Sequence, residues 1–184
     1  MVEPSDRALL ERTLRGDDLE AYGELVRRYQ GSVFNVCYRL MGERQGAEDQ
    51  TQEAFIRAYE RLETFDLERP FGPWIRRVAA NLCYNELRSK APVEVPFDPE
   101  RELASDGPSG NPELQQRRSE LAERVAAALR GLPPHYRAVI ELRHYQGLSY
   151  KEIARALDFS MSEVKTNLYR ARKALAEELG SEAH

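Results

Sequence analysis

The sequence predicts an all-α fold, made of two small helical domains joined by a proline-rich linker. Apolar residues recur at intervals of three and four over most of the chain, as they do in amphipathic helices. No segment alternates apolar and polar residues over the length of a strand. Five of the ten prolines fall within residues 91–112, where a helix cannot continue. We therefore expect domains at residues 1–90 and 113–184, with residues 91–112 as a flexible linker.

The first domain is expected to hold four helices, at about residues 5–15, 19–41, 47–65 and 73–89. A Gly-Asp-Asp run breaks the chain after the first helix, and glycines turn it after the second. Each helix has an apolar stripe that can face a shared core. In the second helix this stripe comprises Leu25, Val26, Tyr29, Val33, Val36, Cys37 and Leu40.

The second domain is expected to hold helices at about residues 112–130, 134–145, 150–157 and 161–179. Ser149 and Glu152 have the spacing of a capping box, and so do Ser160 and Glu163. Each box predicts a helix start, and the few residues between the two helices allow only a sharp turn. This pattern is typical of a helix-turn-helix.

The outward side chains of the last helix are of the types that reach base edges and phosphates in a major groove. They are long hydrogen-bond donors or hydroxyls, which favours DNA binding over a basic face that only meets solvent. They comprise Lys165, Thr166, Asn167, Tyr169, Arg170, Arg172 and Lys173.

The charges along the chain are unevenly distributed, although the formal net charge is only −4. Residues 48–66 carry a net charge of −4, residues 69–90 carry +4 and residues 162–175 carry +3. A protein that only coats DNA has no need of an acidic surface. The distribution instead indicates a protein that bridges DNA and a basic protein partner.

Other features of the sequence exclude several classes of protein. No apolar run approaches the roughly 20 residues of a membrane span, and the N-terminus lacks the apolar core of a signal peptide, so we expect a cytoplasmic protein without membrane insertion. Cys37 and Cys83 are expected to be buried thiols, and no metal site is expected. No nucleotide-binding fingerprint or nucleophile–base pair stands out. We therefore expect neither an enzyme nor a cofactor.

Three segments, in this order, resemble the extracytoplasmic-function (ECF) sigma factors of bacterial RNA polymerase, within the sigma-70 superfamily. The family's core-binding helix is similar to AEDQTQEAFIRAYERLETFD, and its −10 reading and strand-separating helix to RPFGPWIRRVAANLCYNELRSK. Its −35 reading domain is similar to LRGLPPHYRAVIELRHYQGLSYKEIARALDFSMSEVKTNLYRARKAL. Two departures are Asp158, where the family usually has Gly in the turn, and Asn167, where a basic residue is common. Asp tolerates left-handed backbone better than most residues, so the turn is expected to form.

The resemblance implies a protein that binds RNA polymerase core, directs it to promoters with −10 and −35 elements, and helps to melt the −10 region. The implied core-binding residues are Asp49, Gln50, Gln52, Glu53 and Arg57. The implied −10 contacts are Phe65, Phe71, Arg76, Arg77, Asn81, Asn85, Arg88 and Lys90. The implied −35 contacts are Arg143, Lys151, Ser162, Lys165, Thr166, Tyr169, Arg170, Arg172 and Lys173.

Some of the aromatic residues in the first domain must be core, and Trp74, at helical spacing with Val78, is expected to be core rather than a platform for a base.

Two other functions are open at this point. A dimeric helix-turn-helix regulator of duplex operators would explain the second domain but leave the first unused. An interaction module, such as an anti-regulator, would bind a protein partner and no DNA, and Arg170→Ala and Lys165→Ala would then change nothing measurable. The acidic linker and the two separate DNA-reading surfaces also raise a hypothesis about the free protein. Contact between the domains, or an anti-sigma partner, would hold it compact and hide the basic faces.

Overall fold

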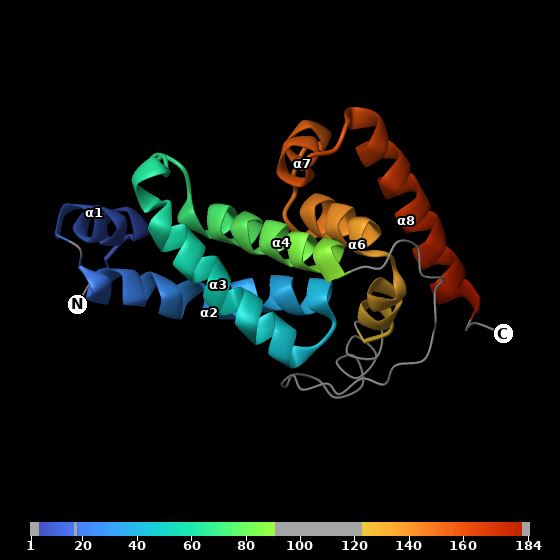
Figure 1. Ribbon diagram of the computed structural model, residues 1–184, viewed down its shortest axis with the longest axis horizontal. Helices are drawn as coiled ribbons and strands as arrows, with labels where there is room; N and C mark the ends of the chain where they lie inside the picture. Colours follow the sequence, from blue (N-terminus) through green and yellow to red (C-terminus); the bar gives the residue numbers. More distant parts are fainter. Residues whose placement is uncertain (1–3, 17, 91–122, 182–184) are drawn as a thin grey trace, which may run out of the picture.

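The computed structural model describes residues 4–16, 18–90 and 123–181, and within these ranges the regular secondary structure is entirely helical (Figure 1). The first unit contains α1 (Asp6–Gly16), α2 (Leu19–Met41), α3 (Arg44–Glu60), the short 3₁₀ helix η1 (Leu62–Thr64) and α4 (Phe71–Lys90). The second contains helical residues 123–131, α6 (Pro134–Ile140), the π-helical η2 (Glu141–Tyr145), α7 (Tyr150–Leu157) and α8 (Met161–Ser181). The predicted all-α class is confirmed.

The long helix α2 is the centre of the first unit, and α1, α3 and α4 all pack against it. It begins at Asp18, whose carboxylate accepts a hydrogen bond from the backbone N–H of Ala21 at 3.0 Å. It ends at Gly42, which has a φ of 79° and so adopts the left-handed conformation that glycine tolerates best. Both caps are local in sequence, which explains why the predicted bounds of this helix match the observed ones. The predicted apolar stripe of α2 is buried or packed against the core.

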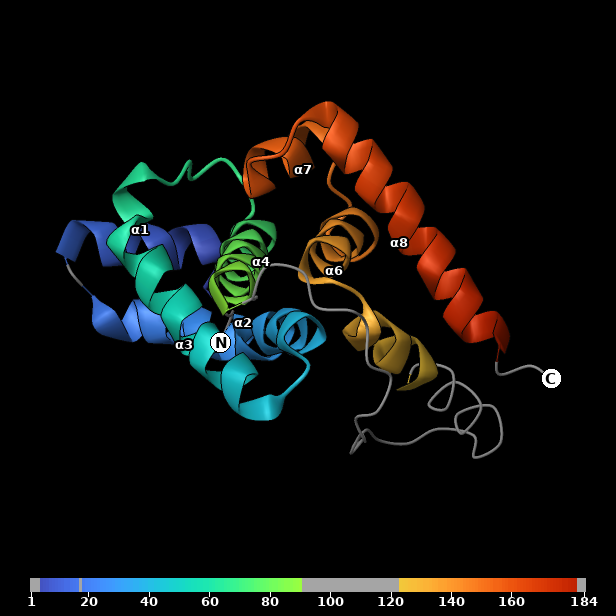
Figure 2. The same ribbon diagram turned by 45° about the vertical axis from the view of Figure 1, so that its right-hand side comes forward.

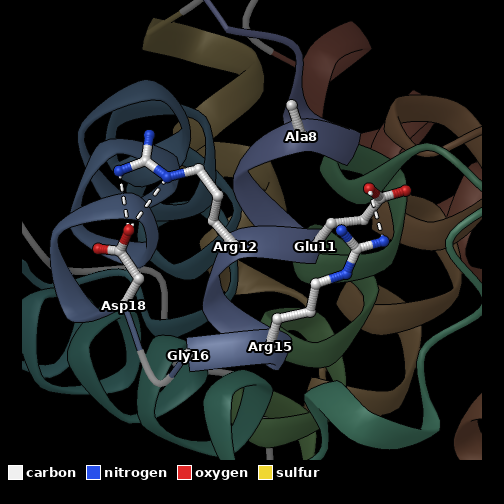
Figure 3. A pocket seen from close by; sticks show the side chains of 6 residues that line it. All are labelled: Ala8, Glu11, Arg12, Arg15, Gly16 and Asp18. Atoms are coloured by element: carbon white, nitrogen blue, oxygen red, sulfur yellow. Dashed lines mark hydrogen bonds and ion pairs between the residues drawn. The ribbon is translucent and has the colours of Figure 1, made fainter.

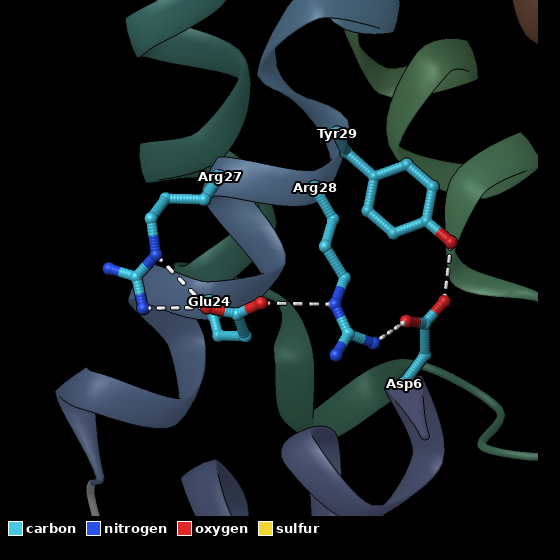
Figure 4. A network of polar contacts seen from close by, with 5 residues as sticks. All are labelled: Asp6, Glu24, Arg27, Arg28 and Tyr29. Carbon is cyan, nitrogen blue, oxygen red and sulfur yellow. Dashed lines mark hydrogen bonds and ion pairs between the residues drawn. The ribbon is translucent and has the colours of Figure 1, made fainter. Parts of the chain in front are cut away.

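A polar network fixes α1 on α2 (Figure 4). Asp6 on α1 accepts hydrogen bonds from Arg28, at 3.0 Å, and from the Tyr29 hydroxyl. Glu24 accepts from Arg28 and Arg27 on the same helix. The Tyr29 ring also packs edge-on against Phe71 at the start of α4, with 5.5 Å between ring centroids. The network therefore links three helices of the first unit.

The second unit has the predicted helix-turn-helix. Both capping boxes form: the Ser149 hydroxyl accepts from the N–H of Glu152, and the Ser160 hydroxyl accepts from the N–H of Glu163. Each glutamate accepts from the backbone N–H of its serine in return. Asp158 closes α7 with a φ of 56°, so the expected left-handed turn is confirmed. Both α6 and α7 pack against α8.

The helix predicted over residues 134–145 departs from a regular α-helix in its second half. After Ile140 the chain widens into a π-helix, in which the N–H of Gln146 donates to the carbonyl of Glu141 at 3.1 Å. Such widened turns are rare and often occur at functional sites. Here the turn accompanies a buried contact between Glu141 and the first unit.

The two units pack directly against each other. Helix α6 lies against both α2 and α4, and η2 and α7 also contact α4. In both views α6 lies between α4 and α8 (Figures 1 and 2). The buried apolar residues of both units form one continuous cluster, in which Cys37 and Cys83 are buried as predicted.

The remaining helices differ from expectation mainly at their ends. Helix α3 begins at Arg44 rather than residue 47 and ends at Glu60, because the chain tightens into η1 before Phe65. The predicted linker and the first part of the helix predicted from residue 112 lie outside the described residues. No helix within the described ranges is long and apolar enough to cross a membrane.

Candidate nucleic-acid interface

Among the described residues, one face of α8 is exposed to solvent. Its opposite face is buried against α6 and α7 through Val164, Leu168 and Ala171. That packing fixes the rotation of the helix and directs the predicted DNA-reading side chains outward. Tyr169 is 69% exposed, which is high for an aromatic residue with no role at a surface. The exposed residues of this face, among those predicted, are Ser162, Lys165, Thr166, Tyr169, Arg170 and Lys173.

Three other predicted −35 residues lie beside this face, and their side chains differ in their contacts and exposure. Arg143 donates to the Leu148 carbonyl at 2.8 Å and lies 5.2 Å from the centre of the Tyr150 ring, so it supports the helix-turn-helix from within. Arg172 lies beside His144, at 3.4 Å between nitrogens. Burial and the neighbouring Arg172 and Arg143 charges lower the pKa of His144. Lys151 is exposed in the first turn of α7.

The basic helix α4 is divided into a covered half and an open half. The guanidinium of Arg76 donates to Gln146 of η2 at 2.9 Å, and that of Arg77 pairs with Glu152 of α7 at 3.5 Å. Asn81 is half-buried, and its side-chain oxygen has no hydrogen-bond partner among the described residues. The predicted −10 residues that are exposed on α4 are Asn85, Arg88 and Lys90.

An aromatic cluster lies where the loop after η1 meets the start of α4. Phe65, Phe71 and Trp74 contact one another, with ring centroids 4.6 Å apart for Phe65 and Trp74 and 5.6 Å for Phe71 and Trp74. Phe71 is only 1% exposed and Phe65 8%. In this conformation the two phenylalanines therefore support the loop from inside. Trp74 packs against the core as predicted, but it is partly buried rather than fully enclosed.

The acidic helix α3 presents the predicted core-binding residues on its surface. Asp49 and Gln52 are exposed. Glu53 and Arg57 bind each other at 2.6 Å, and the Glu53 carboxylate raises the pKa of Arg57. Ile56 stands on the same face, because it lies four residues after Gln52 and three after Glu53, and it is 54% exposed. An exposed isoleucine within an acidic surface is suited to a protein partner rather than to DNA.

An open depression lies along α1, from Ala8 to Gly16, and reaches Asp18 before α2 (Figure 3). Its two arginines are already paired: Arg12 with Asp18 at 2.8 Å, and Arg15 with Glu11 at 3.6 Å. The depression is thus part of the α1–α2 junction, at the opposite end of the molecule from α8 (Figure 1).

Comparison with known proteins bears on the identity of these surfaces. Residues 25–92 match the family model of sigma-70 region 2, and residues 122–175 match that of sigma-70 region 4. The chain is 33% identical over 178 residues to the ECF RNA polymerase sigma factor SigW of Bacillus subtilis, covering 91% of this chain and 94% of SigW. The chain belongs to the ECF sigma factor family.

Two further comparisons agree with this assignment. The ECF RNA polymerase sigma factor SigE of Mycolicibacterium smegmatis is 34% identical over 185 residues, which cover 97% of this chain and 70% of that protein. The solved structure of CnrH in complex with the cytosolic domain of CnrY is 28% identical, with a TM-score of 0.60 over 97% of this chain and 99% of that one. As an ECF sigma factor, the chain has its region 2 around α3 and α4 and its region 4 around the helix-turn-helix.

Sequence reasoning missed two features of this ECF sigma factor. Ile56 was not named as a surface residue, although its position one turn after Gln52 and Glu53 is visible in the sequence. Glu141 was not named either, and its side chain is 2% exposed and bound to Arg39. The residues around Glu141 in the sequence do not indicate that its side chain is buried in an ion pair, because its partner lies 102 residues away.

Proposed function

We propose that this ECF sigma factor binds RNA polymerase core, directs it to promoters with −10 and −35 elements, and helps to melt the −10 region. The observation that supports this most directly is the presence, on one chain, of an acidic region 2 helix with an apolar centre and of two basic helices. The acidic helix suits a basic protein partner, and the basic helices suit DNA.

Core binding is assigned to the exposed face of α3. Asp49, Gln50, Gln52 and Glu53 offer carboxylates and amides to a basic partner helix, and Arg57 aligns Glu53 through their ion pair. Ile56 supplies apolar area at the centre of this face. Interfaces of this kind take much of their affinity from a few buried anchors surrounded by polar groups.

Duplex reading at −35 is assigned to α8. Lys165, Thr166, Tyr169 and Arg170 stand on its exposed face and are placed to enter a major groove. Ser162, Lys151, Arg172 and Lys173 are assigned to phosphates. Phosphate contacts position the helix, and base contacts give the sequence preference. Arg143 is assigned to holding the α7 side of the motif in place, through its bond to Leu148.

Strand opening at −10 is assigned to α4 and the loop before it. Opening DNA without ATP requires a surface that binds unpaired bases more tightly than paired ones. Stacking on aromatic rings contributes about 1–3 kcal/mol per base. Asn81 and Asn85 lie one turn apart on α4 and are assigned to bases, whereas Arg76, Arg77, Arg88 and Lys90 are assigned to phosphates. Phe65 and Phe71 shape the loop, beside the less buried Trp74.

These assignments give each segment of the chain a function. Residues 1–90 bind core and read −10, residues 113–184 read −35, and the proline-rich segment 91–112 joins them. The chain then works in the cytoplasm, where the polymerase carries out all of the chemistry. A regulatory partner of the anti-sigma kind belongs to this proposal, since the similar CnrH was solved with the cytosolic domain of CnrY.

The two other functions considered for the sequence are less well supported. A dimeric operator-binding regulator gives no role to the acidic face of α3. A module that binds no DNA gives none to the exposed basic face of α8. Only the sigma factor uses all three surfaces.

The test is transcription in vitro with the purified chain, sigma-free bacterial core polymerase and a pool of promoter fragments from the source genome. The expected result is specific initiation that requires the chain. Arg170→Ala should weaken promoter recognition by about 1–3 kcal/mol and relax specificity at one −35 position. Arg27→Ala removes an exposed arginine whose ion-pair partner among the described residues, Glu24, lies on its own helix, so it should leave initiation unchanged.

Two outcomes would contradict the proposal. If the chain binds duplex fragments tightly without core and yields no initiation, it is an operator-binding regulator. If Arg170→Ala and Lys165→Ala change nothing while core is bound, α8 is not a DNA-reading helix.

A further inference from the structure

A histidine of region 4 lies directly against one of the arginines that the proposed function assigns to DNA phosphates. His144 is in η2, and its Nε2 atom is 3.4 Å from both Nε and Nη2 of Arg172 on α8. Both residues are exposed. The preceding residue, Arg143, is held by the carbonyl of Leu148, so two arginines border the same imidazole.

The contact with Arg172 sets the state of His144 in the free protein. A guanidinium carries only hydrogen-bond donors, so the Nε2 atom of His144 is the acceptor and the ring is neutral, with its proton on Nδ1. Burial and the charges of Arg172 and Arg143 lower the pKa of His144, which favours the same neutral ring. Protonation would turn the contact into a repulsion between cations.

No acidic side chain offsets the charge of Arg172. Within the described ranges it forms no ion pair with a carboxylate, whereas Lys173 beside it contacts Glu177 at 3.8 Å. The exposed edge of α8 next to η2 therefore combines two cations and a neutral base with no anion. Such a group of side chains is suited to an anionic ligand.

The other charged groups around η2 are engaged elsewhere. Arg39 of α2 binds Glu141, and Arg76 of α4 donates to Gln146. Glu152 of α7 closes its own capping box. The charges that act on the protonation of His144 are therefore the two arginines beside it.

A DNA phosphate is the anion that fits this place. Arg172 and Lys173 lie on the part of α8 that the proposed function brings to the −35 duplex, whose strands carry a regular line of phosphates. A phosphate bound by Arg172 would offset the charge that keeps His144 neutral. An anion within about 4–6 Å favours the protonated imidazole, which then donates from both of its nitrogens.

We propose that His144 is a further contact of this sigma factor with promoter DNA, and that it takes up a proton when the −35 duplex binds. The proposal rests on the proposed function, because it takes α8 to be the −35 reading helix. The proton comes from solvent and returns to it when the duplex dissociates. Since the ring has a higher pKa in the complex than in the free protein, binding is tighter at low pH, and the gain is lost as the pH rises through the pKa of the complex.

The test measures binding of the full-length chain to a labelled duplex at about pH 6 and about pH 8, on either side of the ordinary pKa of histidine, at fixed ionic strength. The duplex is selected from a random pool by the chain itself, so its choice does not depend on transcription. The main variant is His144→Gln, whose amide can accept from Arg172 but takes up no proton.

The matched control is His135→Gln, the same substitution at the other described histidine. The pKa of His135 is lowered mainly by burial, which DNA does not relieve, and further by the charge of Arg170. Thermal melts at both pH values confirm that each variant is folded.

Wild type and His135→Gln should bind the duplex about three- to tenfold more tightly at the lower pH, because one unit of pKa corresponds to a gain in affinity of at most about tenfold. His144→Gln should match the wild type at the higher pH and show no gain at the lower one. Equal gains in wild type and His144→Gln would overturn the proposal. Weaker binding of the wild type at the lower pH, or a chain that selects no duplex, would overturn it as well.

NMR spectroscopy follows the proton directly. The chain has three histidines, so the ring signals of His144 are identified by their loss in His144→Gln. The pKa of this ring should be higher with the duplex bound than without it. An equal or lower pKa in the complex would contradict proton uptake.

Transcription with core polymerase separates this proposal from the function on which it rests. If the wild type supports specific initiation but His144→Gln keeps the full pH dependence of duplex binding, only the proton uptake is wrong. If the wild type binds the duplex with the expected pH dependence but supports no initiation with core, the proposed function is wrong and the DNA contact of His144 stands.

Discussion

Ile56 shows how a single residue distinguishes a binding surface from a solvated helix face. Its neighbours on α3 are acids and amides, for which exposure needs no explanation, but the isoleucine itself is 54% exposed. Scattered apolar residues on a surface are common, and the exposure of Ile56 is informative because it lies within a charged face that we propose to bind core polymerase.

We expect Ile56→Ser to weaken binding to core polymerase about tenfold or more, because truncation of an apolar anchor typically costs more than 1 kcal/mol. The free energy of unfolding should change by less than about 0.5 kcal/mol, as for other surface substitutions. Binding is measured by fluorescence anisotropy of the labelled chain. Arg44→Gln, on another side of α3, serves as control, and equal affinities for Ile56→Ser and wild type would remove Ile56 from the interface.

Asp158 is the one non-glycine residue with positive φ among those described, at 56°. A β-branched side chain is strongly strained in this conformation, so we expect Asp158→Val to lower the free energy of unfolding by about 1–2 kcal/mol. Asp158→Gly should be at least as stable as the wild type. Urea denaturation of the three proteins measures this, and a Val variant as stable as the Gly variant would mean that the turn is not left-handed in solution.

At the scale of elements, the helix ends were predictable where the signals are local. The bounds of α2 and α7 match the prediction because Asp18, Gly42 and the Ser149–Glu152 box act within a few residues. The π-helical turn at Glu141 was not predictable, because it accompanies a contact with Arg39, far away in the sequence. The aromatic cluster was predictable only in part. The spacing indicated that some of its rings belong to the core, but not that Phe71 is the most buried of them.

The contact between α2 and α4 depends on a glycine. A Cβ atom at Gly72 would lie 2.6 Å from a ring carbon of Tyr29, closer than real contacts allow. Gly72→Ala should therefore destabilise the protein by about 1–3 kcal/mol through overpacking, despite the better helix propensity of alanine. Gly31 lies on α2, as Tyr29 does, and a Cβ atom there would be in open space. Gly31→Ala should therefore stabilise the protein by about 0.5–1 kcal/mol. Thermal melts that show both variants shifting in the same direction would contradict this account.

At the scale of the whole molecule, the sequence predicted which surfaces exist but not which are open. Charge along the chain separates an acidic segment from two basic ones, and the structure places each on its own helix. The sequence does not reveal that Arg76 and Arg77 are engaged by region 4. Their partners, Gln146 and Glu152, lie 70 and 75 residues away from them in the sequence. In this arrangement α8 and α3 are accessible, whereas two arginines of the face of α4 that we propose to bind −10 DNA are engaged by region 4.

The most direct test of the central claim is strand opening at a promoter recovered from the transcription pool. Permanganate modifies unpaired thymines, so it reports melting of the −10 region independently of RNA synthesis. The account predicts reactive thymines only when core polymerase and the chain are both present, with reactivity strongly reduced by Asn81→Ala together with Asn85→Ala. Thymines that stay protected with both proteins bound to the promoter would contradict the claim that this ECF sigma factor helps to open DNA.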